Sequence, residues 1–162
     1  MARKHASWIE AFMEYNAAAP SPNLFKHWAA VSAISGALER KVWTKPYGFN
    51  LYPNTYVSLV GPAGVGKSIV TSQVQKLWKE IPDLKVGKSS LTKASLMDEL
   101  RDAERHIIRP GETPSYIEFH FLNILSNELG VFIPAYDAEF MSALTDVWDG
   151  HGYSERRRGT KE

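Results

Sequence analysis

Residues 61–68, GPAGVGKS, have the types and the spacing of a loop that binds phosphate. They fit the pattern G-x-x-x-x-G-K-[ST] at every position. Glycine reaches at low cost the backbone angles that turn successive N–H groups toward one anion, and Lys67 can reach its outer phosphates. The Ser68 hydroxyl is a suitable ligand for Mg²⁺. We therefore predict that a nucleotide is bound by Gly61, Pro62, Ala63, Gly64, Val65, Gly66, Lys67, Ser68 and Ile69.

The segments on either side of this loop strengthen the prediction. Residues 56–60 form an apolar run, which is typical of a strand buried on both faces. Residues 67–79 place apolar side chains at helical spacing, so a helix is expected to begin at the loop and to add its unpaired N–H groups and its dipole. The alternative reading is an ordinary glycine-rich turn between a strand and a helix.

A second acidic motif is expected at the end of another strand. Residues 122–125 form the apolar run, and Asn127 and Glu128 follow it. We expect Glu128 to activate the attacking water, and Ser68, Asn127 and Glu128 to hold Mg²⁺, partly through water. An amide at Asn127 binds a metal-bound water but brings no negative charge, so both hydrolysis and binding without turnover remain open. A surface carboxylate at a strand end is the alternative for Glu128. Asp137 and Glu139 are alternative acids, although they lie in the next loop and helix start, where acids also serve as caps.

Three consecutive arginines, Arg156, Arg157 and Arg158, lie near the end of the sequence. Three roles for these arginines are considered equally. They could bind nucleic-acid phosphates, or one could act as an arginine finger toward a nucleotide held by a neighbouring subunit. The third reading is a solvated cluster of charges.

Composition excludes several classes of protein. The 162 residues suit one domain, and 44% of them are hydrophobic, which is enough for a core. The net charge of +1 gives no global attraction to nucleic acid or membrane. The absence of cysteine rules out disulfides and thiolate metal sites. No apolar run is long enough for a membrane span or a secretory signal, so we expect a cytoplasmic protein without membrane contact.

The pattern along the chain divides it into an N-terminal helical segment, 1–45, and a core, 46–162, that form one compact unit. Helices are predicted over 7–19 and 24–41, separated by the breaker PSPN. A hairpin turn is predicted at Tyr47 and Gly48, and a strand over 83–89. Two more helices are predicted over 91–107, with Thr92 as N-cap, and over 138–150. The histidines show no ligand spacing, so no metal other than Mg²⁺ is expected.

Four blocks of the sequence also carry a resemblance. They are FKHWAAVSAISGALERKVW at 25–43, LYPNTYVSLVGPAGVGKS at 51–68, ILSNELGVFI at 124–133 and LTDVWDGHGYSERRRG at 144–159. In wording and order these blocks resemble a group of P-loop proteins of bacteriophages, prophages and other mobile elements. Members of this group are described as replication or primase-associated helicase-like ATPases. Asn127 stands where the family would have Asp.

The resemblance implies an α/β fold, a P-loop NTPase core with a parallel sheet of the RecA or AAA+ type. It implies a Mg-ATP-binding, ATP-hydrolysing motor or switch domain for DNA replication in a bacterial host cytoplasm. A homo-oligomer, such as a ring, and single- or double-stranded DNA would be its partners. The family continues into a sensor strand beyond this sequence, so an incomplete sheet is expected. The alternatives are a nonhydrolysing phage assembly or scaffold protein and a piece of a DNA-packaging ATPase.

Overall fold

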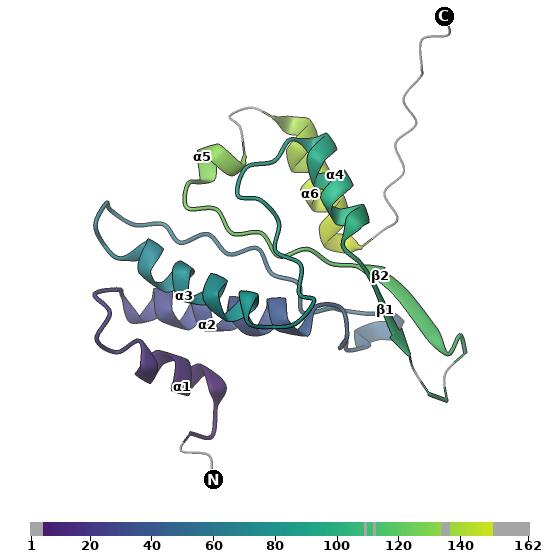
Figure 1. Cartoon of the computed structure of the whole chain (residues 1–162), viewed down its shortest axis with the longest axis horizontal. Helices are drawn as coiled ribbons and strands as arrows, with labels where there is room; N and C mark the ends of the chain where they lie inside the picture. Colours follow the sequence, from purple (N-terminus) through teal and green to yellow (C-terminus); the bar gives the residue numbers. More distant parts are fainter. Residues whose placement is uncertain (1–4, 109, 112, 134–136, 151–162) are drawn as a thin grey trace, which may run out of the picture.

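The computed structural model describes residues 5–108, 110–111, 113–133 and 137–150 of the chain (Figure 1). Its elements in chain order are α1 (Trp8–Tyr15), α2 (Asn23–Leu38), the 3₁₀ turn η1 (Pro46–Gly48), α3 (Lys67–Lys79), α4 (Lys93–Asp102), β1 (Glu104–Ile108), β2 (Tyr116–His120), α5 (Leu129–Phe132) and α6 (Ala138–Asp149). Among these described helices, none is both long and apolar enough to cross a membrane.

Two N-terminal helices form where the sequence predicts them, although α1 ends at Tyr15 and not at residue 19. Ser7 is the N-cap of α1, and its hydroxyl accepts a hydrogen bond of 3.2 Å from the N–H of Ile9. At the other end of α1, the Asn16 amide donates to the carbonyl of Phe12 over 2.9 Å. The chain then turns, and α2 begins after Pro22, which has no N–H to leave unpaired. The PSPN segment therefore separates two helices.

Helices α2 and α3 lie parallel, with their N-termini at the same end of the molecule (Figure 1). Ser21, just before α2, bonds to Gly66, just before α3. Further along both helices, the Trp78 indole N–H donates to the carbonyl of Ala33 over 3.2 Å. The small residues of α2 allow this close approach. Around them lies the first core cluster, made of Phe12, Ala29, Ala30, Ala33, Val70, Val74 and Trp78.

A second core cluster joins α4 to α6. Asp137 caps α6, because its carboxylate accepts a hydrogen bond of 2.8 Å from the N–H of Phe140. The Phe140 side chain is fully buried and contacts the ring of Phe132 edge-on. The buried members of the cluster are Leu91, Leu96, Phe140 and Leu144. The predicted helix over 138–150 is confirmed, with Gly150 as its left-handed C-cap.

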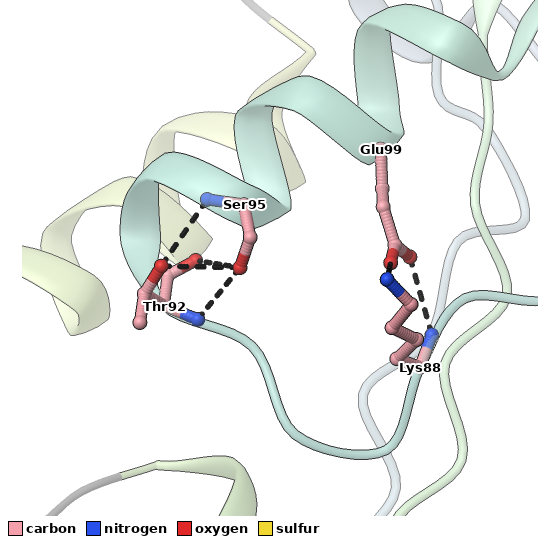
Figure 2. A network of polar contacts seen from close by, with 4 residues as sticks. All are labelled: Lys88, Thr92, Ser95 and Glu99. Carbon is pink, nitrogen blue, oxygen red and sulfur yellow. Dashed lines mark hydrogen bonds and ion pairs between the residues drawn. The ribbon is translucent and has the colours of Figure 1, made fainter.

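The start of α4 is fixed by a reciprocal pair of hydrogen bonds (Figure 2). The N–H of Thr92 donates to the Ser95 hydroxyl over 2.8 Å, and the N–H of Ser95 donates to the Thr92 hydroxyl over 3.3 Å. One turn later, the Glu99 carboxylate accepts the backbone N–H of Lys88 over 3.1 Å. The predicted N-cap at Thr92 is confirmed, and Glu99 attaches α4 to the chain that precedes it.

The helix predicted over 91–107 is wrong in its last part. Helix α4 ends at Asp102, and residues 104–108 form strand β1, which pairs antiparallel with β2. His106 lies opposite Glu118, and Ile107 lies opposite Ile117. Apolar residues at helical spacing favour a helix up to Ile107, but pairing with the residues of β2 overrides that local preference. The hairpin extends away from the helices (Figure 1).

The predicted parallel sheet remains a prediction. In the described ranges, the β1–β2 ladder is antiparallel, and a single parallel bridge joins Val86 to Asn123. This bridge uses two hydrogen bonds, from Gly87 N–H to the Asn123 carbonyl at 2.8 Å and from Asn123 N–H to the Lys85 carbonyl at 3.1 Å. It lies in the segment predicted as a strand over 83–89. Residues 56–60 form no strand in the structure, and Tyr56, Val57 and Val60 are exposed, so the expected strand buried on both faces is not observed there. Residues 122–125 contribute only the bridge at Asn123.

The segment before the loop is fixed by side chains. The Tyr56 hydroxyl donates to the carbonyl of Leu144 over 2.8 Å, and its ring lies 4.9 Å from that of Trp148. The Asn54 amide donates to the Trp148 carbonyl over 3.0 Å. On the side of α2, the Thr55 hydroxyl lies 3.1 Å from that of Ser35. The chain thus enters the loop from between α2 and α6. The predicted hairpin turn upstream is confirmed by a Thr44–Leu51 antiparallel bridge around η1.

Candidate functional site

The loop at 61–68 connects the extended segment 56–60 to the first residue of α3. Gly64 and Gly66 have φ values of 78° and 87°, a region that other L-residues avoid. Gly66 is also the N-cap of α3, and no side chain caps that helix end. The glycines are therefore needed for the conformation of the loop, as the sequence pattern predicts.

Lys67 closes the loop across its mouth. Its ammonium group donates to the carbonyl of Gly61 over 2.6 Å and to the carbonyl of Pro62 over 2.8 Å. The cation is therefore held at the entrance of the loop by two acceptors that a phosphate oxygen could replace. A charged acceptor forms the stronger hydrogen bond with an ammonium group, so the exchange would favour a bound anion.

The backbone of the loop leaves its donors available. Among the described residues, no acceptor receives a hydrogen bond from the backbone N–H groups of residues 63–68. An unpaired N–H costs free energy when it is kept from water, so such groups require water or a ligand. The N–H groups of Lys67 and Ser68 also belong to the first turn of α3, where the helix dipole favours negative charge.

Ser68 fits the role of a metal ligand in one respect. Its side chain is exposed beside Lys67, and among the described residues its hydroxyl has no hydrogen-bond partner. A hydroxyl oxygen is a suitable ligand for Mg²⁺, which prefers oxygen and keeps several waters. Ile69 is exposed on the next position of α3. The residues at the loop thus offer one direct oxygen ligand to a cation bound with a phosphate.

The back of the loop lies against the segment before α2. The Ser21 hydroxyl donates to the carbonyl of Gly66 over 2.7 Å, and Ser21 itself is buried. A Cβ atom on Gly66 would lie 2.6 Å from the Ser21 hydroxyl and 2.8 Å from the carbonyl oxygen of Pro20. At the other end of the loop, a Cβ on Gly61 would meet the Phe25 ring at 3.2 Å. Sequence reasoning missed these contacts, because the PSPN segment indicates only a chain break.

The structure does not connect the acidic motif to the loop. Asn127 and Glu128 are exposed, and Glu128 is the N-cap residue of α5. Within the described part of the chain, neither side chain forms a hydrogen bond or ion pair with residues 61–68. The extended segments 52–61 and 121–127 nevertheless run toward the same end of the molecule, where α3 begins (Figure 1). Arg156, Arg157 and Arg158 lie outside the described residues.

A second group of polar side chains lies on the β1–β2 hairpin. His106 Nε2 is 3.0 Å from a Glu104 carboxylate oxygen and 3.9 Å from one of Glu118. The His106 ring also stacks on Tyr116, and the Tyr116 hydroxyl lies 3.4 Å from Glu118. All three potential ligands are exposed. The alternation Glu-x-His in β1 is the signal that could have revealed their shared face. The two carboxylates and the ring form exposed polar contacts with one another, which account for the arrangement without a metal.

Comparisons with protein families, with curated proteins and with solved structures found no match.

Proposed function

We propose that this chain binds Mg-ATP at residues 61–68 and serves as the ATP-hydrolysing motor or switch domain of a phage-type DNA replication protein. The observation that carries the proposal is the loop itself. It combines unpartnered N–H groups, positive-φ glycines and an ammonium group at its mouth, directly before a helix N-terminus.

Each part of the loop has a role in this function. The N–H groups of 63–68 would hold phosphate oxygens, and Lys67 would leave the carbonyls of Gly61 and Pro62 to contact the outer phosphates. The Ser68 hydroxyl would ligate Mg²⁺. When bound, Mg²⁺ neutralises negative charge on the phosphates. Glu128 would orient the attacking water once it approaches the loop, and Asn127 would hold a water bound to the metal.

The proposed fold is a P-loop core with a parallel sheet. Two observations favour it. Residues 85–87 already pair in parallel with Asn123. The segments that lead to Gly61 and to Asn127 also run in the same direction (Figure 1). A role in replication, an oligomeric state and DNA binding rest on the resemblance of the four sequence blocks.

The loop is tested by measuring the Kd of Mg-ATP for the wild type, Lys67→Ala and Lys79→Ala. Lys79 lies at the other end of α3 and is exposed, so it is a matched control. We expect Lys67→Ala to weaken binding by about 10- to 100-fold, since a hydrogen bond to a charged group is lost. Lys79→Ala should bind as the wild type does. Equal affinity of the wild type and Lys67→Ala would refute the proposal.

A second candidate function is a nucleotide-dependent assembly protein that does not hydrolyse ATP. The amide at Asn127 favours it, because an amide adds no negative charge beside Glu128. Steady-state ATPase measurements with single-stranded DNA, with double-stranded DNA and without DNA separate the two. Turnover stimulated by single-stranded DNA supports the replication motor, and oligomerisation with ATP but without turnover supports the assembly protein. Stimulation by double-stranded DNA alone would favour a packaging motor.

A further inference from the structure

The Ser21 hydroxyl contacts the loop at 61–68 from a distant part of the sequence. Ser21 is buried, and its hydroxyl donates to a single backbone atom. It comes from the segment between α1 and α2 and donates to the carbonyl oxygen of Gly66 over 2.7 Å. Only 7% of Ser21 is exposed, so water competes little for this hydrogen bond. The same carbonyl oxygen also accepts the N–H of Ile69 over 3.2 Å.

The carbonyl of Gly66 belongs to the peptide unit that contains the N–H of Lys67. In a planar trans peptide, the C=O and N–H bonds point in opposite directions. The Ser21 hydroxyl and the Ile69 N–H hold the Gly66 carbonyl toward α2 and α3. The Lys67 N–H therefore points in the opposite direction, toward the loop. A hydrogen bond accepted by the carbonyl also polarises the peptide, which makes its N–H a better donor.

The geometry points to Ser21 as a positioning residue for phosphate, acting through the Gly66–Lys67 peptide; this inference rests on the proposed function. The ligand group that it serves is the polyphosphate part of the nucleotide, since the N–H that it orients donates a hydrogen bond to a phosphate oxygen. Ser21 does not touch the ligand itself.

The surrounding contacts hold Ser21 in place. The Lys26 ammonium, on the first turns of α2, donates to the carbonyl of Ala17 over 3.2 Å, and Lys26 is buried. This bond closes the turn that carries Ser21. Because Gly66 allows no Cβ between itself and Ser21, the turn and the loop are in direct contact. The N-terminal helices therefore form the back wall of the proposed site.

A matched pair of variants separates the hydroxyl from packing. Ser21→Thr keeps the donor, and Ser21→Val has the same shape as Thr without it. We expect the Kd of inorganic pyrophosphate and of Mg-ATP to be about 3- to 10-fold higher for Ser21→Val than for Ser21→Thr, the effect of one neutral hydrogen bond. Ser21→Ala removes the hydroxyl without added volume, so the test can still be made if Ser21→Thr and Ser21→Val do not fold. Its Kd should rise by a similar factor relative to the wild type.

Two controls make the result specific. Ser32→Ala removes a hydroxyl of α2 that donates to the carbonyl of Trp28 on the exposed face, and it should leave the Kd unchanged. The melting temperature of each unliganded variant reports any general loss of stability. Equal Kd values for Ser21→Thr and Ser21→Val, or for Ser21→Ala and the wild type, would overturn the role of Ser21 while Lys67→Ala still loses binding. A wild type that binds neither ligand would overturn both proposals.

Discussion

Trp78 and Gly36 are in contact across the α2–α3 interface, with no room for a Cβ atom between them. A Cβ on Gly36 would lie 2.6 Å from the indole ring and would also meet the side-chain oxygen of Asn123. The Asn123 amide donates to the Gly36 carbonyl over 3.4 Å in the same buried region. This glycine is therefore the point where α2, α3 and the segment after β2 meet.

Gly36→Ala is expected to destabilise the protein by about 1–3 kcal/mol, because the added methyl forces the Trp78 ring and Asn123 to move in a packed core. Gly130→Ala is the matched control, since Gly130 lies in α5 with open space around its Cβ position. Urea unfolding of both variants measures the difference. A Gly36→Ala protein as stable as Gly130→Ala would contradict the contact.

Thr92→Ala should lower the free energy of unfolding by about 1 kcal/mol, since the hydroxyl that accepts the N–H of Ser95 is lost at the start of α4. Thr92→Ser keeps the hydroxyl and should stay close to the wild type. Thermal melts followed by circular dichroism test this pair. The same loss for Ser as for Ala would assign the effect to the methyl group and not to the cap.

Tyr56 should make stability depend on pH in the alkaline range. Burial raises the pKa of its phenol from 10.0 to about 12, so the fold favours the neutral form. This contribution is fully present below pH 10 and is lost as the pH rises from 10 to 12. The effect should be small, because 57% of the residue is exposed and solvent screens the group.

Melting temperatures of the wild type and Tyr56→Phe between pH 8 and 12 give the measurement. We expect the gap between the two proteins to shrink above pH 10, as the wild type loses the hydrogen bond to the Leu144 carbonyl. Tyr47→Phe, at an almost fully exposed ring, should follow the wild type at every pH. A constant gap for Tyr56→Phe would show that Tyr56 does not titrate differently on unfolding.

Arg105→Met should destabilise the protein by about 2–3 kcal/mol. The guanidinium lies 3.3 Å from the carboxylate of Glu39, which is 2% exposed, and it also bonds to the carbonyl of Asp83. Its removal leaves Glu39 buried with only Lys41, at 2.8 Å, as a described cationic partner. Arg101→Met breaks exposed ion pairs and should cost less than 1 kcal/mol. Chemical denaturation that gives equal losses for both would refute this account.

Asn127→Asp should raise the ATP turnover rate by about 10-fold in the proposed enzyme, since groups that bind metal-bound water change activity by such factors. The added carboxylate would attract Mg²⁺ beside Glu128. Asn50→Asp, at an exposed residue whose amide donates to the Tyr52 hydroxyl over 3.3 Å, is a control for added charge. A phosphate-release assay with saturating ATP measures the rate. Unchanged turnover in Asn127→Asp would separate Asn127 from the metal.

The helices that local patterns predict agree well with the structure. α3 runs from Lys67 to Lys79 as expected, because Gly66 supplies the left-handed residue at its start and its apolar residues repeat at helical spacing. Ser7 caps α1, and Thr92 caps α4 as predicted. These features depend on residues within one or two turns, so the sequence contains what decides them.

The end of α4 shows where local patterns fail. Residues 104–107 continue the helical spacing, yet they form β1 because Tyr116–His120 lies opposite them. The grouping of Glu104, His106 and Glu118 follows from that pairing. Strand pairing depends on residues elsewhere in the chain, and the helical spacing of apolar residues gives no information about those partners.

The sequence by itself determined the conformation of the loop at 61–68, since its glycines are a local requirement of the positive φ angles at Gly64 and Gly66. Only the tertiary structure decided which residues contact the back of that loop. Ser21 reaches Gly66, and Arg105 reaches Glu39, because helices and strands pack side by side. The physical reason is that a contact between distant segments is fixed by the packing of whole elements, whereas loop conformation and helix caps are fixed by neighbouring residues.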